Sequence, residues 1–212
     1  MSGTIVCVDD QAEVRRLLAE VFKARGRDVQ PFDDGEAAIA WLAAHEAEMV
    51  VLDLDLGKGK RTGIEICKSL RAAHPDLPII ILTGHGTIDD AVLAVKAGAV
   101  DFLTKPVAAE VLLASVRAGL AQDARSRQAQ AESAALRRRH ASLTAREREV
   151  LAGLVAGKLN KQIAAELGIT EQTTKAHVSA TLAKLGARNR TQATLVFKSL
   201  EMQDVAPLSL ER

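Results

Sequence analysis

The 212-residue chain contains no long uninterrupted apolar run and only two cysteines. Because a membrane-spanning helix needs about 20 consecutive apolar residues, we expect no transmembrane segment. The first residues, MSGTIVCVDD, do not have the pattern of a secretory signal. Cys7 and Cys67 each stand without a cysteine or histidine at metal-ligand spacing, which argues against a zinc site. We therefore predict a cytoplasmic protein with two buried thiols.

The formal charge of +1 conceals an uneven distribution along the chain. Residues 1–119 carry 13 lysines and arginines against 18 aspartates and glutamates, whereas residues 120–212 carry 15 against 9. The first part is therefore acidic and the second part is basic. This asymmetry suggests that the first part binds cations and the second binds a polyanion.

Short apolar runs alternate with amphipathic helical patterns throughout residues 1–119. Such runs, rich in Val, Ile and Leu, are typical of buried parallel strands. Five strands alternating with five helices predict a doubly wound α/β domain with a parallel sheet. The strands are expected at Thr4–Val8, Val29–Phe32, Met49–Leu52, Ile79–Leu82 and Val100–Leu103.

Polar residues follow these strands, and the right-handed crossover rule places all of the strand ends at one edge of the sheet. That edge gathers Asp9, Asp10, Asp53, Thr83 and Lys105. Three carboxylates cannot lie together in ionised form without a cation, and their hard oxygen atoms suit Mg²⁺. A carboxylate oxygen left free is a nucleophile for a phosphoryl group, whose oxygens a lysine and a threonine could hold. The pattern therefore predicts a phosphoryl-accepting magnesium site.

Four motifs, VDD, LDLDL, ILTGHG and AGAVDFLTKP, stand at the first, third, fourth and fifth strands. With them, residues 4–118 resemble the receiver domain of bacterial two-component response regulators, which has a flavodoxin-like fold. The resemblance implies that Asp53 accepts a phosphoryl group from a sensor histidine kinase. It also implies that Asp9, Asp10, Asp53 and the backbone carbonyl of Asp55 bind Mg²⁺.

The same resemblance implies a switching mechanism. Lys105 would pair with the phosphoryl group, Thr83 and Phe102 would form the switch pair, and a cis peptide bond would precede Pro106. Our hypothesis is that phosphate on Asp53 draws Thr83 toward it while Phe102 turns inward. The face formed by the fourth helix and the fifth strand would then be remodelled.

The loop after the acceptor strand departs from the family pattern, which has a proline four residues after the acceptor and a glycine eight residues after it. In this chain Gly57 replaces the proline, and Gly63 lies ten residues after Asp53 but eight after Asp55. Asp55 is therefore a competing acceptor. We favour Asp53, with two additional loop residues, because it ends the apolar run. The basic side chains of the loop are expected to be solvated: Lys58, Lys60 and Arg61.

Two alternative functions use the same residues. LDLDL also resembles the DxD motif of haloacid-dehalogenase-type phosphatases, with Asp53 as nucleophile and Asp55 as acid/base. That family has a further acidic pair after its lysine, whereas Asp9 and Asp10 precede the motif here, and there is no cap domain to select a substrate. The other alternative is a regulator that binds DNA without phosphorylation, against which the full set of site residues argues.

Residues 120–141 separate the two parts of the chain. They are rich in Ala, Gln and Arg, which favour a helix, and contain few large apolar side chains. We therefore predict a solvated helical linker at residues 120–141. It would join a domain at residues 1–119 to a domain at residues 142–205, which a tail at residues 206–212 follows.

Residues 142–205 contain a helix-turn-helix pattern. Thr144 and Glu147 have the spacing of a capping box at the start of a first helix. A short helix at Asn160–Leu167, a tight turn at Gly168 and a longer helix at Glu171–Leu185 follow. The pattern predicts a small all-α domain whose third helix enters the major groove of DNA.

Residues 143–193, from LTAREREVL to RNRTQA, resemble the LuxR-type helix-turn-helix. Together with the receiver, this stretch is similar to the NarL/FixJ class of response regulators. The resemblance implies that Lys175, Ala176 and Ser179 face the bases, although Thr174 and Ser179 replace the commoner valine and lysine. Residues that would hold backbone phosphates or orient the helix are Asn160, Lys161, Thr173 and His177.

The sequence therefore predicts a cytoplasmic transcription regulator that is not an enzyme, apart from its own phosphorylation and dephosphorylation at Asp53. Its expected partners are a sensor histidine kinase, promoter DNA and RNA polymerase, and no membrane. A homodimer is expected on activation. The helix expected at Thr191–Met202 looks like a dimer surface of this class.

Overall fold

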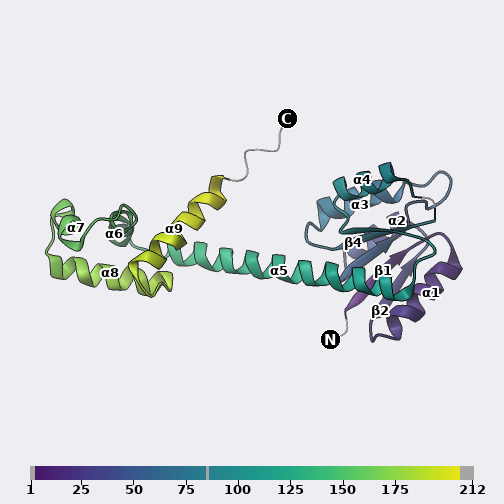
Figure 1. Ribbon diagram of the computed structural model, residues 1–212, viewed down its shortest axis with the longest axis horizontal. Helices are drawn as coiled ribbons and strands as arrows, with labels where there is room; N and C mark the ends of the chain where they lie inside the picture. The colour runs from purple at the N-terminus through teal and green to yellow at the C-terminus, as the bar shows by residue number, and fades with distance from the viewer. Residues whose placement is uncertain (1–2, 85, 206–212) are drawn as a thin grey trace. The chain divides into compact units, whose positions relative to one another are not determined.

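The computed structural model describes residues 3–84 and 86–205 of the chain (Figure 1). The tail predicted at residues 206–212 and His85 of the fourth-strand motif lie outside the described residues. The chain divides into two compact units, Met1–Arg127 and Gln128–Arg212. We call these the first unit and the second unit.

The first unit is built around a five-stranded sheet in the order β2-β1-β3-β4-β5. Every neighbouring pair of strands is parallel, and a helix connects each strand to the next along the chain. The predicted doubly wound α/β fold is therefore confirmed. The strands are β1 Thr4–Val8, β2 Asp28–Phe32, β3 Met49–Leu52, β4 Ile79–Thr83 and β5 Asp101–Thr104.

Helices cover both faces of this sheet (Figure 1). Because successive residues of a strand point to opposite faces, β3 contributes Val50 and Leu52 to one core and Met49 and Val51 to the other. Helices α2, α3 and α4 complete the first core, and α1 and the start of α5 complete the second. The helices are α1 Ala12–Lys23, α2 Gly35–Leu42, α3 Gly63–Ala73, α4 Ile88–Lys96 and α5 Ala109–Ala141.

Both cysteines are buried and free, as the sequence predicted. Burial raises the pKa of the Cys7 thiol to about 12, and the nearby charge of Asp9 acts in the same direction. Burial also raises the pKa of the Cys67 thiol, to about 11. Both thiols are therefore protonated near neutral pH and behave as small apolar core residues.

Helix α5 begins in the first unit and ends in the second as one helix of 33 residues. Leu112, Leu113 and Val116 near its start are buried in the first unit. Residues 124–132, in its middle, are all exposed, which agrees with their lack of large apolar side chains. None of the described helices combines the length and the apolar character that crossing a bilayer requires.

The second unit is a small helical domain in which α7 and α8 form a helix-turn-helix. At the start of α6, Thr144 and Glu147 form the predicted capping box. Gly168 ends α7 with a φ of 64°, a left-handed conformation that suits glycine and makes the tight turn before α8. The helices are α6 Ala145–Val155, α7 Asn160–Leu167, α8 Glu171–Leu185 and α9 Arg190–Val205.

The last turn of α5 contributes to the packing of this second unit. The ring of His140 lies 5.7 Å from the ring of Phe197 in α9. Just beyond the helix, the carbonyl oxygen of Ser142 accepts a 3.4 Å hydrogen bond from the ammonium of Lys184 in α8. Leu143 follows and is only 2% exposed, in a core shared with α6 and α8. The end of α5 is thus fixed to the helix-turn-helix domain.

We expect Leu70→Ala to lower the free energy of unfolding of the first unit by about 2–5 kcal/mol, because Leu70 is fully buried between α3 and the sheet. Urea unfolding followed by the fluorescence of Trp41, the single tryptophan of the chain, measures this change. Leu17→Ala is the matched control, because Leu17 is 60% exposed, and should change the free energy by less than about 0.5 kcal/mol. Equal effects of the two substitutions would contradict the assignment of this core.

Candidate functional site

Three carboxylates meet at the carboxyl edge of the sheet. Asp9 and Asp10 follow β1, and Asp53 follows β3, which is the direct neighbour of β1. One oxygen of each carboxylate lies within 4.8 Å of the other two. Asp9 and Asp53 are buried, at 1% and 4% exposure, while Asp10 is exposed and opens the group to solvent. Parallel pairing of β1 and β3 therefore builds an acidic pocket from residues far apart in the sequence.

Lys105 brings a cation into this pocket from the end of β5. Its ammonium nitrogen lies 2.7 Å from Oδ2 of Asp53 and 2.5 Å from Oδ2 of Asp9. Its backbone N–H donates a 2.7 Å hydrogen bond to the carbonyl oxygen of Thr83, the last residue of β4. The peptide bond between Lys105 and Pro106 is cis, as the resemblance implied. The lysine is thus held both at its backbone and at its charged end.

The pocket shifts the ionisation of its members. Burial raises the pKa of Asp53 above its ordinary value of 3.8, although the hydrogen bond and charge of Lys105 act against that rise. Burial lowers the pKa of Lys105, but hydrogen bonds to Asp53 and Asp9 outweigh it and raise the pKa above 10.5. Lys105 therefore stays charged near neutral pH. One ammonium cannot balance three ionised carboxylates, so the pocket has an excess of negative charge.

This donor set fits a magnesium ion. Mg²⁺ binds carboxylate and carbonyl oxygens and keeps several of its waters, so it needs a site that is partly open to solvent. Asp9, Asp10 and Asp53 supply closely spaced oxygens, and Asp10 lies on the solvent side. The acidic group is therefore typical of a receiver Mg²⁺ site.

Asp55, the competing acceptor, lies outside this group. Its side chain is exposed, and its Oδ1 accepts the backbone N–H of Gly57 at 3.0 Å. Its own backbone N–H donates a 3.4 Å hydrogen bond to Oδ1 of Asp53. Only Asp53, of the two carboxylates, contacts Lys105. The geometry thus favours the register in which Asp53 is the acceptor.

The longer loop after Asp53 is tied down at several points. Gly57 and Gly59 adopt left-handed conformations with φ of 97° and 81°, which make room for the two additional residues. Two of the basic side chains expected to be solvated are exposed but have specific partners. Lys60 donates to the carbonyl oxygen of Asp33, and Arg61 pairs with Glu36, both at 2.8 Å.

The close contacts of two glycines at the site were not predicted from the sequence. Gly63 starts α3 so close to the acceptor that a Cβ there would lie 2.1 Å from the carbonyl oxygen of Asp53. Gly86 precedes α4, and a Cβ there would lie 2.6 Å from the ring of Phe102 and 2.8 Å from Cγ2 of Thr83. The ring of Phe102 therefore lies beside the strand end that carries Thr83. The spacing of residues pointed to Gly63 as part of the loop pattern, but not to the atoms that either glycine approaches.

A groove of about 770 Å³ continues from the acidic pocket. Asp10, Asp53 and Lys105 line one end, and Leu17 of α1 and Val107 line its apolar part. The groove places the predicted acceptor next to open, partly apolar surface. A donor of phosphoryl groups can therefore approach Asp53 from solvent.

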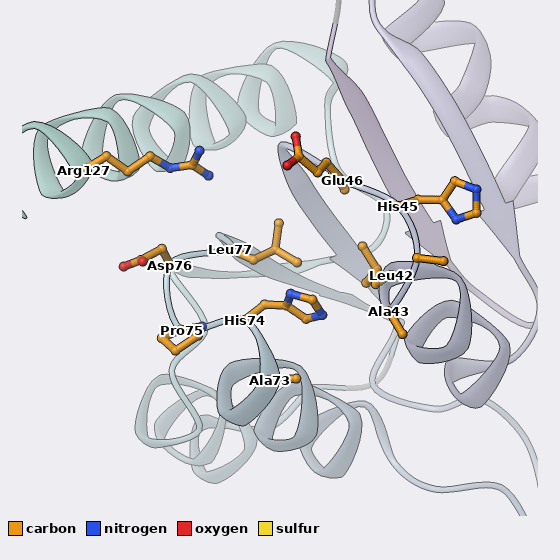
Figure 2. Close-up of a pocket in the computed structure, with 12 residues that line it drawn as sticks. Leu42, Ala43, His45, Glu46, Ala73, His74, Pro75, Asp76, Leu77 and Arg127 are labelled. Carbon is orange, nitrogen blue, oxygen red and sulfur yellow. The ribbon is translucent and has the colours of Figure 1, made fainter. Parts of the chain in front are cut away.

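A second hollow, of about 670 Å³, lies at the opposite edge of the sheet, where α2 and α3 end (Figure 2). None of the predicted site residues lines it. Two of its polar groups have other partners: the ring of His45 stacks on Trp41 at 4.3 Å, and Arg127 pairs with Asp123 at 2.9 Å. The hollow shares no lining residue with the groove at the acidic pocket.

In the second unit, α8 presents the residues expected to face DNA. Lys175, Ala176 and Ser179 are all exposed on this helix. Among the residues expected to contact phosphates or orient the helix, Lys161 and Thr173 are exposed and Asn160 and His177 are half-buried. Thr173 is also held by Thr170, which caps α8.

Two contacts in this unit, one of Thr174 and one of Glu147, were not predicted from the sequence. Thr174, which stands where valine is commoner, is fully buried, and its hydroxyl donates to the carbonyl oxygen of Thr170 at 3.1 Å. A hydroxyl can therefore replace an apolar group here without losing a hydrogen bond. Glu147 of the capping box is 5% exposed and pairs with Lys184 of α8 at 2.7 Å, so it fixes α6 to α8.

Comparison with known proteins gives the same division. Residues 5–117 match the response regulator receiver domain, and residues 141–197 match the family described as bacterial regulatory proteins, luxR family. The chain is 35% identical to the transcriptional regulatory protein FixJ of Bradyrhizobium diazoefficiens over 187 residues, 88% of this chain and 90% of that one. It is also 35% identical to the response regulator protein TodT of Pseudomonas putida, over 83% of this chain and 77% of that one.

Solved structures extend this similarity to the full length. The structure of the response regulator StyR aligns with a TM-score of 0.78 at 35% identity, covering 94% of this chain and 100% of that one. Full-length FixJ from B. japonicum aligns with a TM-score of 0.59 at 33% identity, covering 95% and 99%.

We expect Mg²⁺ to raise the Tm of the first unit, because binding only to the folded state adds about 2.7 kcal/mol at 100 times the dissociation constant. Asp10→Asn should raise the Tm without Mg²⁺, since it relieves repulsion in the acidic pocket, and should reduce the shift that Mg²⁺ causes. Thermal unfolding followed by Trp41 fluorescence, with and without Mg²⁺, measures both effects. Glu46→Gln, an exposed acid at the opposite edge, is the control and should keep the full Mg²⁺ shift.

Proposed function

Because the chain belongs to the two-component response regulators that join a receiver domain to a LuxR-type DNA-binding domain, we propose that phosphorylation of Asp53 controls its binding to promoter DNA. Members of this family are transcription regulators and not enzymes that turn over a separate substrate. The observation that carries the proposal is the contact of Lys105 with Asp53 inside the acidic pocket. Lys105 also contacts Asp9, so its charge lies between two carboxylates, and of the two candidate acceptors Asp53 and Asp55 it contacts Asp53.

The chemistry of the pocket supports this assignment. A carboxylate oxygen of Asp53 attacks the phosphorus of a phosphohistidine or a small acyl phosphate, and the bond from phosphorus to the donor breaks. A Mg²⁺ ion held by Asp9, Asp10, Asp53 and the backbone carbonyl of Asp55 would neutralise the charge of the transferring group. Lys105 already lies within hydrogen-bond distance of Asp53. Its ammonium can therefore donate a hydrogen bond to an oxygen of the phosphoryl group that Asp53 accepts.

Thr83 and Phe102 then act as the switch pair. Thr83 is 1% exposed at the end of β4, and Phe102 lies in the adjacent strand β5. Both side chains lie next to Gly86. Movement of the Thr83 hydroxyl toward the phosphoryl group therefore changes the space next to the ring of Phe102. Movement of this ring alters the surface formed by α4 and β5.

That surface and α9 support a homodimer as the active state. Ile88, Val92 and Val95 of α4 are 84%, 47% and 62% exposed, and Leu195 of α9 is 64% exposed. Exposed apolar side chains grouped on one helix are typical of protein contacts. A dimer would present two α8 helices to half-sites about one helical turn apart.

In the DNA complex, Lys175, Ala176 and Ser179 face the bases, while Asn160, Lys161, Thr173 and His177 hold phosphates or orient α8. The exposure of Lys161 and of the first turns of α8 supports these roles. The other partners in this proposal are a sensor histidine kinase and RNA polymerase. Because these partners and promoter DNA meet there, we place the regulator in the cytoplasm.

Labelling with acetyl phosphate and Mg²⁺ tests the proposed acceptor. Wild type and Asp55→Asn should take up one phosphoryl group per chain, and Asp53→Asn should take up none, because the nucleophile is lost. Binding to a duplex selected from a random-sequence library should tighten on labelling in the first two proteins only. Labelling that persists in Asp53→Asn but disappears in Asp55→Asn would assign the acceptor to Asp55. Equal DNA binding with and without label would favour phosphorylation-independent regulation.

Replacement of one phosphate-contacting lysine should reduce the salt dependence of DNA binding. Each phosphate that is neutralised contributes about 0.9 to the slope of log K against log salt, so Lys161→Ala should lower that slope by about one. Lys198→Ala is the matched control, because Lys198 is also exposed but lies on α9. Fluorescence anisotropy with the selected duplex at several salt concentrations measures the slopes. An unchanged slope for Lys161→Ala would remove Lys161 from the DNA interface.

A further inference from the structure

Ser115 is a polar residue in an otherwise apolar part of α5. It is 8% exposed, and its neighbours Leu112 and Val116 belong to the core between α5 and the sheet. A buried hydroxyl is costly unless it has a hydrogen-bond partner. Ser115 donates to Oδ2 of Asp101, the first residue of β5, at 2.5 Å.

Asp101 uses its second carboxylate oxygen on the neighbouring residue. Its Oδ1 accepts the backbone N–H of Phe102 at 2.8 Å. Because β5 is the last strand of the sheet, backbone groups on its outer side need partners other than a further strand. The carboxylate of Asp101 therefore joins the backbone of Phe102 to a side chain of α5 through two charge-assisted hydrogen bonds.

The other end of Phe102 reaches the proposed phosphorylation site. A Cβ at Gly86 would lie 2.6 Å from the ring of Phe102 and 2.8 Å from Thr83, so the ring and Thr83 share one small space. A continuous set of contacts thus leads from Thr83 through Phe102 and Asp101 to Ser115. Helix α5, which carries Ser115, continues to Ala141 in the second unit.

We propose that the Asp101–Ser115 hydrogen bond is a positioning contact that couples Phe102 to α5 and so passes the phosphorylation of Asp53 to the DNA-binding unit. The inference rests on the proposed function and adds two residues to it. Neither Asp101 nor Ser115 touches the acidic pocket, so both act through Phe102.

The directionality of this bond suits it to such a role. An O–H donor and a carboxylate at 2.5 Å lose most of their interaction when the atoms separate beyond about 3.5 Å. A small shift of β5 that accompanies movement of Phe102 therefore changes the bond, whereas the apolar contacts of Leu112 and Val116 tolerate sliding. A buried hydroxyl that loses its acceptor must find another, which favours an altered position of α5.

Four single variants of the full chain, and the double variant Ser115→Ala with Asp101→Asn, test the coupling. Ser115→Ala removes the donor, Asp101→Asn removes the charge of the acceptor, and Ser115→Thr keeps a hydroxyl. Ser126→Ala, an exposed serine on the same helix, is the matched control. Labelling with acetyl phosphate and binding to the selected duplex are measured for each variant, with and without the label. The readout is the factor by which labelling tightens DNA binding.

We expect Ser115→Ala and Asp101→Asn to be labelled as wild type and to bind DNA as wild type without the label. Each should reduce the gain on labelling by roughly fivefold, the low end of typical allosteric couplings. The double variant should lose about as much as Ser115→Ala alone, because both substitutions act on the same bond and Ser115→Ala already removes it. Ser115→Thr and Ser126→Ala should keep the wild-type gain.

A wild-type gain in Ser115→Ala would overturn the inference. So would a change of affinity that is equal with and without the label, since that is what a purely structural role of Ser115 produces. If Ser115→Ala fails to fold, the comparison of Asp101→Asn with Ser115→Thr decides in the same way. Absence of label on the wild-type chain would instead refute the proposed function itself, which is thereby distinguished from failure of the coupling.

Discussion

The first unit depends on one electrostatic arrangement, the ammonium of Lys105 between the carboxylates of Asp9 and Asp53. Two buried carboxylates from adjacent strands would repel each other strongly without it. The cation can reach them only because β1, β3 and β5 run in the same direction and end at the same edge of the sheet. The parallel topology therefore brings the two carboxylates together, and it also brings Lys105 to the place where its charge offsets their repulsion.

The negative charge of the pocket is only partly balanced, since one ammonium faces three carboxylates. The excess negative charge favours the binding of a divalent cation. With that cation and Lys105 both present, the pocket favours a group whose oxygens can contact the two positive charges. In the proposed mechanism, transfer of a phosphoryl group to Asp53 would change the partners of Lys105 without removing its charge. Under that proposal the pocket would have two states that differ in the partners of Lys105 and Thr83, which is what a switch requires.

The sequence was sufficient for features that depend on strand ends and helix periods. Asp9, Asp53, Thr83 and Lys105 each follow a short apolar run, so the fold class alone brings them together. It was insufficient for contacts that depend on side-chain packing between distant segments, such as the ring of Phe102 over Gly86 or the bond from Ser115 to Asp101. In the sequence, Ser115 is only a polar residue on the apolar face of a helix. Its partner becomes evident only from the position of β5.

The longer loop after Asp53 explains why residue spacing alone left two candidate acceptors, Asp53 and Asp55. The loop is closed at its two ends by short-range contacts: Asp55 accepts the N–H of Gly57, and the N–H of Gly63 donates to Leu54 at 2.8 Å. Between these contacts, Gly57 and Gly59 adopt left-handed conformations, and residues 58–61 are exposed. The proposed acceptor position is therefore supported by the close approach of Gly63 to Asp53, where a Cβ would lie 2.1 Å from the carbonyl oxygen of Asp53. The loop residues in between lie at the rim of the pocket. There Lys60 donates to the carbonyl oxygen of Asp33, and Arg61 pairs with Glu36.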